Sequence, residues 1–214
     1  MHISESILPA KLLITGYGIT GLATWYSLRQ IHQQADPTIG IPKASLLTAA
    51  FFVASSLHIP IPPASVHFVL NGLLGTILGN YAFPAILVGL FLQAVMLGHG
   101  GLTTLGVNGV IMGIPALISG MIFQQRMRFY DQFNPVWATR IFAFLAGGAG
   151  VGISACLFWG LVMTSLPANL ASSTEQLTIL LLVIGHIPLV IIEGIFTAMV
   201  VSFLQKSKPQ LLPE

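Results

Sequence analysis

The sequence predicts an all-α integral membrane protein, a bundle of about seven transmembrane helices formed by a single domain of residues 1–214. The residues are 55% hydrophobic and only 7% charged, whereas soluble domains carry about 25% charged residues. The mean hydropathy is +0.88, and several apolar stretches approach the ~20 residues that a helix needs to cross a bilayer. We therefore expect a multi-pass protein of the bacterial inner membrane. The formal charge of +2 is too small to indicate a nucleic-acid partner.

Seven apolar stretches are the expected helices. The second, third and fourth are short, as in a tightly packed bundle or one with pieces that do not fully cross. The stretches are roughly residues 12–29, 44–59, 65–80, 82–98, 105–125, 138–164 and 176–203. The segment 98–104 is too rich in glycine for a helix, so we expect a loop there that dips into the outer face of the bundle.

The basic residues predict how the bundle is oriented. With seven spans, the loops after the first and fifth spans and the segment after the last span lie on one side of the membrane. That side carries seven of the eight Lys and Arg residues, namely Arg29, Lys43, Arg126, Arg128, Arg140, Lys206 and Lys208. The positive-inside rule makes this side cytoplasmic, so the N-terminus is expected outside and the C-terminus inside. A single crossing by residues 65–98 would invert the sides upstream of it.

Histidines gather at the outer mouth of this predicted bundle. Four of the six lie at or near the outer face in this topology, namely His2, His58, His67 and His99. Imidazole is the usual nitrogen donor for Ni²⁺, Co²⁺, Cu²⁺ and Zn²⁺. The cluster therefore indicates a transition-metal site, whereas His32 falls in a cytoplasmic loop where a solvated surface role is the default.

Position 2 offers the sharpest chemistry. The Met1 amine, the amide nitrogen of His2 and its Nδ1 could bind one ion through adjoining five- and six-membered chelate rings. The imidazole of His67 is the candidate fourth ligand of a square-planar site, a geometry suited to Ni²⁺ and Cu²⁺. We expect Met1 to be the mature first residue, because no signal-peptide pattern precedes the first span. A free, solvated His2 is the alternative that the residues alone leave open.

Three further polar residues are candidates for supporting this site. Asn71 lies four residues after His67, on the same face of the expected helix, and could orient a ligand or link two helices. Glu193 is the only carboxylate inside a confident span; it could bond His186, two turns away, or place a charge near the metal. Glu5 could accept hydrogen bonds that hold the N-terminal segment, or start the first helix.

Other features allow different functions. Ala50 and Ala54 are small residues at helical spacing and could dock a partner membrane subunit or serve ordinary packing. Ser154, in a segment that faintly resembles a nucleophile turn, could pair with His186 in an intramembrane serine protease. A structural membrane subunit that binds no metal is a third reading.

Four segments in order along nearly the whole chain resemble the CbiM/NikM family, the substrate-binding (S) components of energy-coupling-factor transporters for cobalt and nickel. They are Met1-His2-Ile3 with Glu5 and Leu8-Pro9, His67 to Leu73, Leu92-Gln93 followed by Gly100 to Asn108, and His186-Ile187-Pro188 with Ile192 to Ala198. The resemblance implies seven helices and metal ligation by the Met1 amine, the His2 amide and imidazole, and the His67 imidazole. Ser6 departs from the family's glycine, and His99 could add a donor.

The resemblance also implies what the protein does and with what. Such a subunit is not an enzyme and needs no organic cofactor; it takes up Co²⁺ or Ni²⁺ as its transported substrate, for uses such as cobalamin biosynthesis. The expected partners are a transmembrane coupling (T) subunit, two cytoplasmic ATPases and a small accessory membrane subunit. The chain has no GxxxxGK(S/T) phosphate loop, as expected where partners hydrolyse ATP. Cobalt and nickel both remain open.

Overall fold

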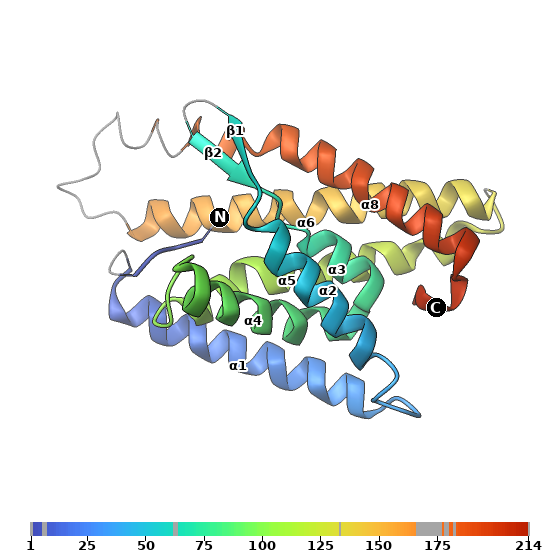
Figure 1. Cartoon of the computed structure of the whole chain (residues 1–214), viewed down its shortest axis with the longest axis horizontal. Coiled ribbons are helices and arrows are strands. Elements are labelled where there is room, and N and C mark those ends of the chain that lie inside the picture. The colour runs from blue at the N-terminus through green and yellow to red at the C-terminus, as the bar shows by residue number, and fades with distance from the viewer. Residues whose placement is uncertain are drawn as a thin grey trace.

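The computed structural model describes residues 2–5, 8–61, 64–132, 134–165, 177, 180, 181 and 183–213. Figure 1 shows helices packed alongside one another, with the N-terminal segment and the C-terminal turn toward opposite ends of the long axis. The predicted all-α membrane class is confirmed, because four helical stretches are long and apolar enough to cross a bilayer. These are Asn71–Leu97, Leu105–Phe129, Pro135–Ser165 and Ile187–Ser207.

The described helices match most of the predicted spans in order. They are α1 (Ala10–His32), α2 (Ile41–Ala54), α3 (Asn71–Leu78), α4 (Ala82–Leu92), α5 (Leu105–Gln124), α6 (Pro135–Ser165) and α8 (Ile187–Ser207). A π-helical turn, Gln93–Leu97, extends α4, and 3-10 turns lie at Gly79–Tyr81, Gln125–Phe129 and Pro209–Leu211. The predicted last span, 176–203, falls partly outside the described residues.

Between α2 and α3 the chain forms strands, so the predicted helical ends at 55–59 and 65–70 are wrong. Helix α2 ends at Ala54, and two short strands follow, β1 (His58–Ile61) and β2 (Ala64–His67). They pair antiparallel with His58 opposite His67. Pro60 lacks a backbone donor and breaks helical bonding, while β-branched neighbours suit an extended chain. Hydropathy alone does not separate a short apolar strand from a helix.

The predicted break between the third and fourth spans is present. Helix α3 ends at Leu78, and Gly79 follows with φ 55°. Glycine adopts this left-handed conformation without steric cost, so the chain turns through Gly79–Tyr81 before α4 begins at Ala82.

Close approach of α3 and α6 positions the start of α3. A Cβ atom added at Gly72 would lie 2.5 Å from the carbonyl oxygen of Gly147, and one added at Gly150 would lie 2.5 Å from Gly72. Only glycines allow these backbones to touch. The end of the hairpin that carries His67 is therefore held against the centre of the bundle.

Candidate metal-binding site

Three imidazoles from distant parts of the chain form one cluster. The His2 and His67 ring centroids are 5.2 Å apart, and the His99 ring lies 5.9 Å from His2 and 6.4 Å from His67. The three residues come from the N-terminal segment, the end of β2 and the loop after the π-helical turn. The structure thus brings together three of the histidines predicted at the outer mouth, His2, His67 and His99; Met1 lies outside the described residues.

The His2 ring is oriented by a side chain that the sequence analysis did not single out. Its Nε2 donates to Oε1 of Gln93 at 2.8 Å. Because a carbonyl oxygen can only accept, Nε2 carries the proton and Nδ1 carries the lone pair. Gln93 is fully buried and begins the π-helical turn, a distortion that often marks functional positions. The sequence feature that could have indicated this role is a polar amide side chain, Gln93, within the apolar stretch 82–98.

The His67 ring is oriented by its own backbone. Its Nδ1 donates to the carbonyl oxygen of Phe68 at 2.9 Å, so the lone pair lies on Nε2. The side chain is 9% exposed at the end of β2. Both rings therefore carry a nitrogen in the protonation state that a metal ion needs.

Asn108 in α5 holds the N-terminal segment like a partner strand. Its Oδ1 accepts from the Ile3 backbone N–H at 2.9 Å, and its Nδ2 donates to the Ile3 carbonyl at 3.2 Å. The Ile3 side chain is 1% exposed. These bonds satisfy both backbone groups of a buried residue. Because Ile3 follows His2, they also hold the His2 ring within the imidazole cluster. In the sequence, only the family motif that ends at Asn108 drew attention to this residue.

The glycine-rich segment 98–104 is a loop, as predicted, and it closes over the N-terminal segment. Gly98 and Gly100 have φ of 64° and 79°. The backbone N–H of Thr103 donates to Oε1 of Glu5 at 3.3 Å, and a Cβ added at Gly101 would lie 2.0 Å from Cγ of Glu5. Glu5 thus contacts the loop, while the first helix starts later, at Ala10.

Asn71 links helices. Its Nδ2 donates to the carbonyls of Met112 and Gly150 and to Oγ of Ser154, at 3.1, 3.2 and 2.7 Å. The expected helical face shared with His67 is wrong, because α3 begins only at Asn71. Ser154 is fully buried and donates to Gly150, an environment closed to a substrate.

Glu193 on α8 bonds the segment that follows the β1–β2 hairpin. Its two carboxylate oxygens accept from the backbone N–H groups of Val69 and Leu70. The side chain is 1% exposed. The hydrogen bonds of the described residues thus place Glu193 on these two amides rather than on His186. Sequence spacing along one helix could not reveal a partner 124 residues away.

Side chains alone do not complete a metal site. Among the described residues, no group of three or more His, Cys, Asp or Glu side chains is placed to hold a metal ion. The two oriented imidazoles, His2 and His67, are the side-chain donors whose tautomers the hydrogen bonds define. Burial holds the pKa of His2 well below its usual value of 6.5, so the ring is neutral at pH 7 and its lone pair is available.

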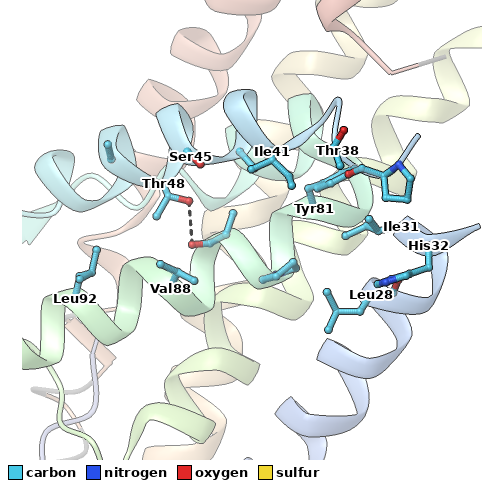
Figure 2. Close-up of a pocket in the computed structure, with 15 residues that line it drawn as sticks. Leu28, Ile31, His32, Thr38, Ile41, Ser45, Thr48, Tyr81, Val88 and Leu92 are labelled. Carbon is cyan, nitrogen blue, oxygen red and sulfur yellow. Dashed lines mark hydrogen bonds between the residues drawn. The ribbon is translucent and has the colours of Figure 1, made fainter. Parts of the chain in front are cut away.

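A separate cavity of about 680 Å³ lies between α1, α2 and α4 (Figure 2). Two of its polar side chains have partners: Thr48 donates to the Ala85 carbonyl, and the Tyr81 hydroxyl lies within hydrogen-bonding distance of Oε1 of Gln34 and the Pro37 carbonyl. The remaining lining is mostly apolar, so this cavity is unsuited to a metal ion.

The two alanines on α2 that were predicted to dock a partner differ in their exposure. Ala50 is exposed, whereas Ala54 is buried at 9% exposure. Only Ala50 is therefore open to a neighbouring subunit.

Several apolar helices, with an imidazole cluster at the start of the N-terminal segment, define a multi-pass membrane protein with nitrogen donors gathered in one place. A family model described as the cobalt uptake substrate-specific transmembrane region, CbiM, matches residues 2–211. The chain belongs to the CbiM family, and it is a cobalt/nickel transport membrane component of the cell membrane rather than an enzyme.

Individual relatives agree with this assignment. A Haemophilus influenzae protein named for metal transport is 32% identical over 215 residues, which are 99% of this chain and 97% of that protein. An Archaeoglobus fulgidus protein named as a fused nickel transport protein, NikMN, is 30% identical over 219 residues, 100% of this chain and 68% of that protein. The crystal structure of a truncated transition metal transporter has the same fold, with a TM-score of 0.68 at 22% identity, covering 96% of this chain and 99% of that one.

Proposed function

We propose that this chain is the subunit that captures Co²⁺ or Ni²⁺ for uptake, with four nitrogen ligands. The ligands are the Met1 amine, the amide nitrogen and Nδ1 of His2, and Nε2 of His67. The observation that carries the proposal is the approach of the His2 and His67 rings, whose centroids are 5.2 Å apart.

The distance between these rings suits a shared ion. A metal–nitrogen bond of about 2 Å places two imidazole centroids roughly 4.5–6.5 Å apart around one ion. Each ring also carries its lone pair on the nitrogen that this arrangement requires, because Gln93 and the Phe68 carbonyl take the other N–H. Nδ1 of His2 is the nitrogen that closes a six-membered ring with its own amide.

The ligand set also narrows the class of substrate. Imidazole, amine and amide nitrogens favour nickel, cobalt, copper and zinc, whereas Mg²⁺ and Ca²⁺ prefer oxygen ligands. The family description names cobalt and one relative's name includes nickel, so these two ions are the proposed substrates.

Family members act with other transporter components. We extend the proposal to an energy-coupling-factor arrangement, in which a transmembrane coupling subunit and two cytoplasmic ATPases drive release of the captured ion. The absence of a GxxxxGK(S/T) motif from the sequence supports ATP hydrolysis by partners. The exposed small residue Ala50 on α2 is the proposed contact with the coupling subunit.

A calorimetric titration of the purified detergent-solubilised protein with Ni²⁺ and Co²⁺ tests the proposal. The decisive variant adds two alanines before Met1, which keeps every side chain but moves the amine out of the four-nitrogen chelate that includes Nδ1 of His2. We expect this variant and His2→Ala to lose binding by at least ~10-fold. His32→Ala is the control, since this exposed ring bonds Leu28 within α1. Unchanged affinity in the extended protein would exclude the chelate and favour a structural subunit.

A further inference from the structure

We infer that Glu193 is a positioning residue for the metal site, because its carboxylate fixes the turn that aims His67 at His2. This inference rests on the proposed function, in which Nε2 of His67 is the fourth ligand. Glu193 lies on α8, whereas the turn follows β2 much earlier in the chain.

The first observation is the pair of hydrogen bonds between the Glu193 carboxylate and the turn after β2, which we call the clamp. One carboxylate oxygen accepts from the Val69 N–H, and the other accepts from the Leu70 N–H at 2.8 Å. These two amides are two and three residues beyond His67. A carboxylate has two acceptor oxygens and no donor, so it satisfies both amides at once, whereas a glutamine would turn an NH₂ group toward one of them.

The second observation is the backbone conformation that the clamp holds. Leu70 has φ 52° and is the only non-glycine residue with positive φ in the described part of the chain. A branched side chain rarely adopts this conformation unless its surroundings impose it. The Leu70 side chain is 6% exposed, so the bonded carboxylate and the core, rather than solvent, hold this turn.

The third observation is where the turn leads. Leu70 precedes α3, and Asn71 anchors the start of that helix to α5 and α6. The chain is therefore fixed just after the turn, while His67 bonds the Phe68 carbonyl just before it. Val69 and Leu70, the two residues that Glu193 holds, connect the His67–Phe68 bond to the anchored start of α3. Their conformation therefore determines the direction of the His67 ring.

A buried carboxylate in an apolar helix is costly and is retained where it serves a purpose. A neutral side chain would serve packing equally well, so the two bonded amides account for the acid at this position. Since the clamp acts through His67, its loss should change the metal geometry as well as the affinity.

The test compares Glu193→Gln with Thr197→Val, a control one turn along α8. Thr197 is 1% exposed and its Oγ1 has no hydrogen-bond partner among the described residues. For each purified protein, we would measure Ni²⁺ and Cu²⁺ affinity, the visible ligand-field spectrum and the thermal midpoint without metal. We expect Glu193→Gln to bind ~10–100-fold more weakly, with a spectrum shifted as expected for loss of one nitrogen ligand. Thr197→Val should match the wild type.

A double-mutant cycle separates positioning from a general loss of structure. In a His67→Ala background, Glu193→Gln should cause no further loss of affinity, because the residue it positions is gone. In Glu193→Asp the side chain is shorter by one methylene, so its oxygens no longer reach the two amides, and we expect the same loss of affinity as in Glu193→Gln. This variant replaces Glu193→Gln in the test if Glu193→Gln does not fold. Additive losses in the cycle, or wild-type affinity in Glu193→Gln, would overturn this inference alone. Failure of the wild type to bind either ion would overturn the proposed function and the inference with it.

Discussion

The His2 imidazole and the Gln93 amide, 91 positions apart, are joined by a 2.8 Å hydrogen bond in which Nε2 of His2 donates. This bond selects one tautomer of the ring and leaves the lone pair on Nδ1. Nδ1 is also the ring nitrogen nearest the backbone, so it can share an ion with the residue's own amide. An outer hydrogen bond of this kind is a common means of orienting a metal ligand.

Replacing Gln93 should therefore weaken metal binding without removing a ligand. Gln93→Leu removes the acceptor, and we expect Ni²⁺ affinity to fall ~10–100-fold by titration calorimetry. Gln93→Glu restores an acceptor oxygen and should bind at least as tightly as the wild type. Gln205→Leu is the control, because Gln205 donates to Thr139 in another part of the bundle. Wild-type affinity in Gln93→Leu would show that the tautomer is set by other contacts.

Asn108 should control docking of the N-terminal segment. Asn108→Leu leaves the Ile3 N–H and carbonyl without partners, and each buried unsatisfied group costs about 1–3 kcal/mol. We expect faster hydrogen exchange at residues 2–5 and metal affinity reduced by more than ~10-fold. Asn134→Ala removes an exposed asparagine that only caps the start of α6, and it should leave both measurements unchanged. Protected exchange at residues 2–5 in Asn108→Leu would argue against this role.

Gly101 should be intolerant of a side chain because Glu5 occupies the space. A Cβ there would lie 2.0 Å from Cγ of Glu5, so Gly101→Ala should lower the thermal midpoint. Adding Glu5→Ala removes the clashing atom, and the double variant should be less destabilised than the sum of the single variants. Gly18→Ala, where nothing lies within 4 Å, should be stabilising by about 0.5–1 kcal/mol. If the changes in thermal midpoint of the Gly101→Ala and Glu5→Ala variants simply add in the double variant, the contact between Gly101 and the Glu5 side chain is contradicted.

Acid should loosen the metal-free protein through His2. Burial lowers the pKa of His2 well below 6.5, so the undocked ring takes up a proton at a pH where the docked ring stays neutral. The docked state therefore loses stability as pH falls below about 6.5, by at most about 1.4 kcal/mol per pH unit for one proton. Above this pH the ring contributes no slope. The thermal midpoint, followed from pH 8 to 5, should fall less steeply in His2→Phe than in the wild type or His32→Phe; equal slopes would count against it.

Ala50 offers a test of partner docking. Ala50→Leu should preserve the thermal midpoint, because the side chain is exposed, but should reduce recovery of the coupling subunit in a pull-down. Gly21→Leu, at an exposed α1 position with nothing within 4 Å, is the matched control. Full recovery of the complex with Ala50→Leu would move the proposed docking face elsewhere.

The sequence alone determined the class of this protein. A composition with 7% charged residues excludes a solvated globular surface, and α4, α5 and α6 begin close to where hydropathy predicted them. Histidines at positions 2 and 67 were candidates because imidazole is a common nitrogen donor for transition metals, and the resemblance to the CbiM/NikM family favoured them over a free, solvated His2. The same hydropathy was misleading at residues 55–70, where prolines and β-branched residues form a strand pair that is as apolar as a helix.

Only the tertiary structure decided how the candidates act together. Gln93, Asn108 and Glu193 each bond a residue at least 91 positions away, and spacing along one helix cannot reveal such a partner. Within an apolar bundle an unpartnered buried polar group is costly, so packing favours arrangements that supply partners, wherever in the chain they lie. Composition and motifs therefore specify which groups need partners, while the packing of glycine-lined helices decides which backbone and side-chain groups come within hydrogen-bonding distance.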